Sequence, residues 1–200
     1  KMLFTVGRRI GVGSVGGVRE VMRVSMSGAA SASGGSGEMP NVLPKTPINM
    51  FVVGKDGNAA KSTGEYFGNG KIVAFGVPGA FTPVCSNKHV PSFVQKLEAF
   101  KELGVDRVAC ISVNDPFVMK AWAESLGVDV SKMDMLADFS GDFAKQIKTS
   151  VDLSVAGLGT RSKRFSMYVV NGVVKAFNSE APGDFQTTSA EHLIEQIEAL

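Results

Sequence analysis

The chain has 200 residues, 44% of them hydrophobic, and a formal net charge of +2. This is enough for one domain with a hydrophobic core, and the small net charge gives no electrostatic case for nucleic-acid binding. The two cysteines and two histidines are too few for a disulfide-stapled scaffold or a structural zinc site. The apolar runs are far too short to span a membrane. We therefore expect no membrane association, and cysteines that serve chemistry rather than architecture.

The first 45 residues differ in composition from the rest of the chain. They contain four arginines and many serines and glycines, but only two acidic residues. Such a composition is typical of an organelle transit peptide, and the small residues of 27–37 are typical of a flexible linker. We therefore divide the chain into a transit peptide with linker over 1–45 and a folded domain over 46–200. This predicts a mitochondrial or plastid location; a basic tail without targeting function would leave the protein in the cytoplasm.

Three glycines of this leader, Gly11, Gly13 and Gly16, match G-x-G-x-x-G, the fingerprint of dinucleotide-binding sites. The fingerprint has this meaning only between a strand and a helix, with an acidic residue about 20 positions further on. Here the corresponding region consists of alanines, serines and glycines. We therefore predict no nucleotide site in the leader.

From residue 47 onward, apolar runs that fit strands alternate with segments that fit helices. In chain order we predict a strand at 47–53, a helical turn at 63–67, a strand at 71–77, a helix at 83–103 that Pro91 kinks or loosens, a strand at 107–113, a helix at 115–126, a strand at 132–137, a helix at 141–147, a hairpin of strands 164–170 and 173–178 across Asn171-Gly172, and a helix at 190–200. This order predicts an α/β protein with a thioredoxin-like fold, in which a central mixed β-sheet carries helices on both faces.

Cys85 follows the strand 71–77 and lies in the first turn of the helix 83–103. The unpaired N–H groups and the positive end of the helix dipole favour an anion at such a position. A thiol placed there loses its proton more easily, and the thiolate is its reactive form. The hydroxyl of Thr82 lies three residues upstream. The sequence therefore predicts a reactive sulfur at Cys85.

Pro78, Thr82 and Cys85 fit the pattern P-x-x-x-T/S-x-x-C, which resembles the active-site motif of the peroxiredoxins. Four runs, in the same order, are similar to the type II members of that family over 47–200. These runs are 73–85, 109–115, 136–138 and 163–167. The resemblance implies a thiol peroxidase that reduces hydrogen peroxide and alkyl hydroperoxides without a metal, haem or flavin cofactor. It also implies glutaredoxin with glutathione, or thioredoxin, as the reductant, an antioxidant role and a homodimer.

Peroxide reduction defines what the site needs. A thiolate attacks one oxygen of the O–O bond while the other leaves, so the site must favour the thiolate, align the bond and stabilise charge on the departing oxygen. The Thr82 hydroxyl and the N–H groups near Cys85 suit the alignment, and Pro78 would limit water. The resemblance places the catalytic guanidinium at Arg164, and Arg161 is a second candidate. An arginine suits this task because it is a fixed cation with several donors.

Cys110 lies in the apolar strand 107–113. A buried and inert cysteine is one interpretation. The other is a resolving thiol that attacks the sulfenic acid formed on Cys85, which the resemblance implies for some plant-type members. The position of the resolving cysteine in animal-type members is occupied here by Thr188. A bridge from Cys110 to Cys85 needs Cα atoms within about 7 Å; without it, glutathione or a glutaredoxin would attack the sulfenic acid directly.

His89 follows Cys85 by one turn on the same helix face. A Cys–His pair suggests a cysteine hydrolase, but no orienting acid is evident, and packing or a hydrogen bond near the site fits better. Phe81 and Leu158 fit either an apolar wall of the pocket or ordinary core packing. The main alternative to a peroxidase is a thioredoxin-fold redox sensor or binding protein with little turnover. The absence of a C-x-x-C pair argues against an ordinary thioredoxin.

Overall fold

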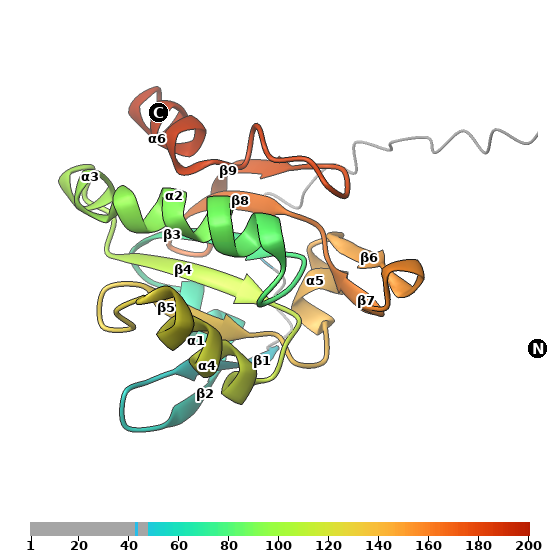
Figure 1. Cartoon of the computed structure of the whole chain (residues 1–200). Coiled ribbons are helices and arrows are strands. Elements are labelled where there is room, and N and C mark those ends of the chain that lie inside the picture. Colours follow the sequence, from blue (N-terminus) through green and yellow to red (C-terminus); the bar gives the residue numbers. More distant parts are fainter. Residues whose placement is uncertain (1–42, 44–47) are drawn as a thin grey trace, which may run out of the picture. The chain divides into compact units, whose positions relative to one another are not determined.

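The computed structural model describes Leu43 and residues 48–200 (Figure 1). The transit peptide predicted within 1–45 and the glycine fingerprint at 11–16 lie outside the part that is described. Within the described part, no helix combines the length and the apolar character that a membrane crossing requires.

A mixed sheet of seven strands forms the centre of the fold, in the order β2-β1-β5-β4-β3-β8-β9. Strand β4 lies between β3 and β5 and is parallel to both, and all other neighbours are antiparallel. The strands are β1 (Asn49–Val53), β2 (Asn58–Ser62), β3 (Lys71–Val77), β4 (Arg107–Ser112), β5 (Asp134–Ala137), β8 (Phe165–Val170) and β9 (Val173–Ser179). The short pair β6 (Ser150–Asp152) and β7 (Thr160–Ser162) forms a separate hairpin.

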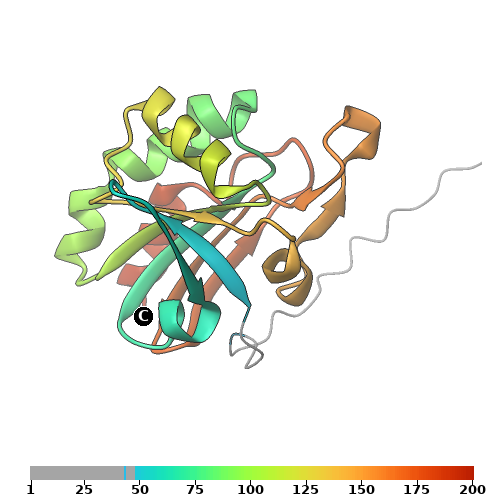
Figure 2. The same ribbon diagram turned by 90° about the horizontal axis from the view of Figure 1, so that it is seen from below.

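Helices cover both faces of the sheet (Figure 2). They are α1 (Thr63–Phe67), α2 (Val90–Gln95), α3 (Leu97–Glu102), α4 (Pro116–Leu126), α5 (Asp142–Gln146) and α6 (Ala190–Glu198). Helices α2, α3, α4 and α6 contribute to the hydrophobic core on one face, and α1 and α5 to the core on the other. This is the predicted α/β architecture.

Strand β3 shows why both faces are buried. Its residues Val73, Phe75 and Val77 belong to the core beneath α2 and α4, whereas Ile72 and Ala74 belong to the core beneath α1 and α5. Side chains alternate between the two faces of a sheet, so a strand that is covered on both faces appears in the sequence as a continuous apolar run. Strand β3 thus passes through the middle of the fold, and Cys85 lies beyond its carboxyl end.

The helix predicted over 83–103 is interrupted at two places. Pro83 and Val84 are helical, and a π-helical turn follows at Cys85–His89, in which the Val90 N–H bonds to the Cys85 carbonyl. The helix breaks again at Lys96, between α2 and α3. Pro91 has no N–H, and its ring clashes with the carbonyl four residues earlier in a regular α-helix. The wide turn just before Pro91 accommodates both effects, so the disturbance expected from this proline falls on the turn that carries Cys85.

Three strands were not predicted. Strand β2 has the sequence Asn-Ala-Ala-Lys-Ser, which contains no β-branched or aromatic residue. It forms because the chain turns back beside β1 through a hydrogen bond from the Gly54 N–H to the Gly57 carbonyl, 3.0 Å. Strands β6 and β7 have three residues each, too few for an alternating pattern to be visible.

Candidate active site

The loop that precedes Cys85 leaves β3 at its carboxyl end, and Arg164 reaches the same edge of the sheet. Strand β8 runs antiparallel to β3, with Phe165 opposite Gly76. A Cβ atom on residue 76 would lie 1.8 Å from Cε1 of Phe165, so only glycine lets the ring cross the strand here. This register brings Arg164, the residue before β8, to the place where the Cys85 helix begins.

Cys85 and Arg164 meet in a buried position although they are 79 residues apart in the sequence. Nη1 of Arg164 lies 3.7 Å from Sγ of Cys85. The two residues are 1% and 4% exposed. A fixed cation at this distance, away from bulk water, is well placed to stabilise negative charge on the sulfur. Of the two candidate arginines, Arg164 is therefore the one that the fold brings to the sulfur.

The guanidinium of Arg164 is held by groups without a formal charge. Its Nε–H donates to the carbonyl of Asp184 at 2.9 Å, and its Cζ lies 5.7 Å from the centroid of the Phe185 ring. None of the ion pairs found in the described part of the chain includes Arg164. Its positive charge is thus directed at the sulfur and not at a carboxylate.

His89 supports the same guanidinium from the helix. Its Nδ1 lies 3.0 Å from Nη1 of Arg164, and its Nε2 lies 3.0 Å from the carbonyl of Thr188. Because a guanidinium only donates and a carbonyl only accepts, the imidazole is neutral, with its proton on Nε2. Burial and the neighbouring Arg164 charge lower the pKa of His89 to about 3. A ring whose free nitrogen faces Arg164 is not placed as a base for the sulfur, which argues against a cysteine hydrolase.

Thr82 closes the loop and starts the helix. Its Oγ1–H donates to the Gly79 carbonyl at 2.9 Å, and its own carbonyl accepts the Ser86 N–H at 3.0 Å. Thr82 and Pro78 are half-buried. Phe81, between them, is 56% exposed and so does not belong to the core. The residues of the sequence motif thus form one compact loop over the start of the Cys85 helix.

Arg161, the second candidate, lies beside this loop and makes no hydrogen bond to the sulfur. Its Nη1–H groups donate to the carbonyl of Val113 at 3.1 Å and to Oδ1 of Asn114 at 3.2 Å. Its Nε–H donates to the carbonyl of Leu158 at 2.8 Å. Arg161 therefore connects the segment after β4 with the segment before β7.

Comparison with known proteins agrees with this geometry. The Redoxin family model matches residues 38–194. The mitochondrial peroxiredoxin-2F of Arabidopsis thaliana is 48% identical over 134 residues, which are 66% of this chain and 66% of that protein. The chloroplastic peroxiredoxin-2E-2 of Oryza sativa subsp. japonica is 40% identical over 157 residues, which are 78% of this chain and 70% of that protein. The chain belongs to the redoxin family and is a type II peroxiredoxin.

A solved structure, reduced Prx3 from Vibrio vulnificus in complex with hydrogen peroxide, matches this peroxiredoxin with a TM-score of 0.72 and 38% identity, over 78% of this chain and 96% of that chain. The thioredoxin-like fold predicted from the order of strands and helices is thereby confirmed. Peroxiredoxins are thiol peroxidases with an antioxidant role, and membership makes this chain an oxidoreductase of that class.

Cys110 lies in the middle of β4, where its sheet neighbours are Phe75 of β3 and Met135 of β5. Its side chain is fully buried, and it belongs to the same core as Cys85. Burial, and then the neighbouring Cys85, raise the pKa of the Cys110 thiol well above its ordinary value. In this structure both thiols are free, and the surroundings of Cys110 disfavour its thiolate form.

Two polar residues of the site were not predicted. Asn114 Oδ1 accepts the Ala80 N–H at 3.0 Å, and Glu180 Oε1 accepts the N–H groups of Gln186 at 2.6 Å and Thr188 at 2.9 Å. Neither residue stands out in the sequence, because an asparagine before a helix is common and a glutamate is usually exposed. Only their positions just after predicted strands could have indicated that they belong to the site.

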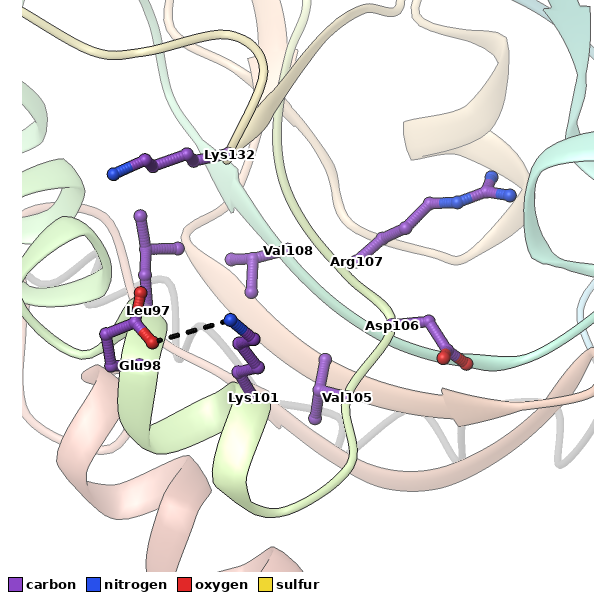
Figure 3. A pocket seen from close by; sticks show the side chains of 8 residues that line it. All are labelled: Leu97, Glu98, Lys101, Val105, Asp106, Arg107, Val108 and Lys132. Atoms are coloured by element: carbon purple, nitrogen blue, oxygen red, sulfur yellow. Dashed lines mark ion pairs between the residues drawn. The ribbon is translucent and has the colours of Figure 1, made fainter.

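The pocket in Figure 3 lies where the parallel strands β3 and β4 begin, at the end of the sheet opposite to Cys85. It has a volume of about 200 Å³ and is lined by α3 and the start of β4, with Lys101 and Glu98 forming an ion pair at 3.8 Å. It shares no residue with the Cys85 loop. In the described part of the chain, no three or more His, Cys, Asp or Glu side chains are grouped to bind a metal ion.

Proposed function

We propose that Cys85 is the peroxidatic cysteine of this peroxiredoxin, and that it reduces hydrogen peroxide and small alkyl hydroperoxides. The observation that carries the proposal is the 3.7 Å contact between Arg164 Nη1 and Cys85 Sγ. It sets a cation without a carboxylate partner against a buried sulfur at the start of a helix, which is the charge arrangement that thiolate attack requires.

The chemistry balances with one thiolate and one peroxide. The sulfur of Cys85 attacks the hydroxyl oxygen of the hydroperoxide, the S–O bond forms as the O–O bond breaks, and Cys85 becomes a sulfenic acid. The other oxygen leaves as hydroxide or alkoxide and takes a proton from solvent. In this proposal Arg164 stabilises the charge as it passes from sulfur to the departing oxygen. Thr82 aligns the peroxide, and Pro78 limits the access of water to the sulfur.

We propose that an external thiol reduces the sulfenic acid, supplied by glutathione with glutaredoxin or by thioredoxin. The thiolate of the reductant attacks the sulfenic sulfur, a mixed disulfide forms and hydroxide leaves as water; a second thiol then releases Cys85. The burial of Cys110 and its raised pKa support this route over resolution by Cys110, because the attacking species must be a thiolate that reaches the sulfur.

We also propose that residues 1–45 include a transit peptide for a mitochondrion or a plastid. The Arg-rich, acid-poor composition supports this, and two relatives are named as mitochondrial and chloroplastic proteins. Fusing these residues to a fluorescent reporter tests the proposal: organelle import supports it, and a diffuse cytoplasmic signal contradicts it.

A homodimer is the remaining part of the proposal. It is implied by the resemblance to type II peroxiredoxins. It fits the exposure of Phe81, Phe117 and Phe139, at 56%, 75% and 51%, because these residues follow the parallel strands β3, β4 and β5 at one edge of the sheet. Sedimentation equilibrium of the reduced protein would give twice the chain mass if this holds.

Turnover with a defined reductant tests the main proposal. Reduced protein is mixed with hydrogen peroxide, glutathione and glutaredoxin, and peroxide consumption is followed. We expect rapid turnover that is lost in Cys85→Ser, falls at least 100-fold in Arg164→Ala and is nearly unchanged in Cys110→Ala. Alanine is chosen at 110 because a serine hydroxyl would be buried there without a partner.

Three results would contradict the proposal. Full activity of Cys85→Ser would exclude Cys85 as the attacking group. A single oxidation without cycling would favour the redox sensor over the peroxidase. Loss of turnover in Cys110→Ala, together with an intramolecular disulfide in the intact mass of the oxidised wild type, would show that Cys110 resolves the sulfenic acid.

A further inference from the structure

The loop 78–82, which carries Thr82, contains a backbone conformation that needs support. Phe81 has a φ of 61°, in the left-handed region that residues other than glycine, asparagine and aspartate rarely adopt. Its side chain is exposed, so packing in the core does not hold it there. A residue in such a conformation persists only where its surroundings fix it, which raises the question of what fixes this loop.

Asn114 holds the loop through a hydrogen bond to its backbone. It lies two residues after the end of β4, next to the point where the loop leaves β3, because Val77 and Ser112 pair at the ends of these strands. Its Oδ1 accepts three hydrogen bonds. They come from the Ala80 N–H at 3.0 Å, from the Ser112 hydroxyl at 2.7 Å and from Nη1 of Arg161 at 3.2 Å.

Arg161 completes the support from the other side of Asn114. Its three hydrogen bonds to Asn114, Val113 and Leu158 hold the guanidinium in one place, and it takes part in none of the ion pairs of the described residues. A Cβ atom on residue 79 would lie 3.1 Å from its Nη1. Gly79 therefore lets the guanidinium come close to the loop backbone.

These contacts continue to Thr82 through a single peptide plane. The Ala80 N–H, which Asn114 holds, and the Gly79 carbonyl belong to the same planar peptide unit. That carbonyl accepts the Thr82 hydroxyl proton at 2.9 Å. With its proton donated there, Thr82 Oγ1 presents its lone pairs to a peroxide O–H. The direction of the peptide plane thus sets the direction of the hydroxyl.

We propose that Asn114 and Arg161 are positioning residues that orient the Thr82 hydroxyl toward the peroxide by holding the peptide between Gly79 and Ala80. They act on peroxide alignment and leave the charge on the sulfur to Arg164. The inference rests on the proposed role of Cys85. It gives the two arginines different roles, with Arg161 acting on peroxide alignment and Arg164 on the charge of the sulfur.

Two rates measured on the same protein separate this role from a general structural one. The first is the second-order rate of oxidation by hydrogen peroxide. The second is the rate of alkylation of Cys85 by iodoacetamide, which needs the thiolate but no peroxide alignment. Both are measured in Cys110→Ala, so that only one thiol reports. We expect Asn114→Ala and Arg161→Met to lower the peroxide rate roughly 10- to 100-fold and to change alkylation less than about threefold.

Conservative and control variants sharpen the comparison. Asn114→Asp keeps an acceptor for the Ala80 N–H and should retain the peroxide rate within about threefold of its parent. Asn178→Ala removes a half-buried amide that bonds to Ser166 and Gln196 away from the site, and it should leave both rates unchanged. Arg161→Met carries the same test if Asn114→Ala does not fold.

The possible failures are distinguishable. If each variant, Asn114→Ala and Arg161→Met, loses as much of its alkylation rate as of its peroxide rate, the two residues support the site as a whole. That result would overturn the inference. An unchanged peroxide rate in both variants would overturn it as well. If the parent protein itself does not react with peroxide at Cys85, the proposed function fails and not the positioning role.

Discussion

Nη1 of Arg164 lies 3.0 Å from Nδ1 of His89, and the same nitrogen lies 3.7 Å from Sγ of Cys85. The hydrogen bond to His89 therefore controls the direction of the nitrogen that faces the sulfur. It also controls the protonation of the ring, because an N–H at Nδ1 would point at a donor. The two residues form one unit that keeps a cation at the sulfur and a neutral imidazole behind it.

The first prediction concerns the acceptor on His89. In His89→Leu the guanidinium loses one of its fixed partners, and we expect the rate of Cys85 oxidation by peroxide to fall roughly 10- to 100-fold. His89→Asn retains an acceptor near the position of Nδ1 and should lose less. Stopped-flow oxidation of the reduced proteins measures both. Equal rates in the wild type and His89→Leu would show that Arg164 is held without His89.

The second prediction concerns stability at low pH. The pKa of His89 is lowered to about 3 in the folded protein, mainly by burial, against about 6.5 in the unfolded chain. The unfolded chain therefore binds the proton first as the pH falls. The stabilisation is fully present above about pH 6.5 and is lost progressively between there and about pH 3. At pH 5 the loss in unfolding free energy is about 2 kcal/mol.

Urea unfolding of the wild type and His89→Asn between pH 8 and pH 4.5 measures this difference. The wild type should lose about 2 kcal/mol more than the variant on going to pH 5. Asp138, whose pKa is raised by burial, acts in the opposite direction in both proteins and cancels in the comparison. Parallel profiles of the two proteins would contradict a neutral, buried His89.

Local sequence patterns were sufficient for one half of the site. The loop 78–82 and Cys85 form a continuous motif, so their proximity to each other and to a helix start could be predicted from the chain alone. Arg164 was placed only by resemblance, because no periodicity reveals a contact across 79 residues. Its position depends on the pairing of β8 with β3, which the sequence shows only as two apolar runs.

The parts that were missed depend on packing. Asn114 accepts the backbone N–H of Ala80 from the loop after another strand, and Glu180 accepts backbone N–H groups from the segment that follows it. Nothing in the local sequence marks those partners. Strand β2 lacks β-forming residues and owes its existence to pairing with β1. The π-helical turn at Cys85 was signalled only indirectly, by Pro91, since a proline predicts a disturbance but not which turn absorbs it.

The third prediction tests the register that delivers Arg164. In Gly76→Ala the new Cβ would lie 1.8 Å from the Phe165 ring, so β8 must shift and carry Arg164 with it. We expect a destabilisation of at least about 2 kcal/mol and a loss of peroxide rate in the fraction that folds. Gly64→Ala, in α1 with nothing within 4 Å of its new Cβ, is the control and should be neutral or slightly stabilising. Similar behaviour of the two variants would disprove the steric argument.

The fourth prediction concerns Glu180, which organises the segment that holds both Arg164 and His89. Its Oε1 accepts the N–H groups of Gln186 and Thr188, and its own N–H donates to the Arg164 carbonyl at 3.0 Å. The same segment supplies the Asp184 and Thr188 carbonyls that bond to the two side chains. Removing the carboxylate should therefore release the partners of the guanidinium and the imidazole together.

Glu180→Ala leaves two backbone donors without their acceptor, so we expect the unfolding free energy to fall by about 2–3 kcal/mol. At a temperature where the variant is folded, we expect its peroxide rate to be at least about tenfold lower than that of the wild type. Glu180→Gln keeps an oxygen acceptor and should show a smaller loss in both measurements. Glu191→Ala, on the exposed side of α6, is the matched control. If Glu180→Ala is less stable but reacts with peroxide at the wild-type rate, the segment supports the fold while Arg164 and His89 keep their places without it.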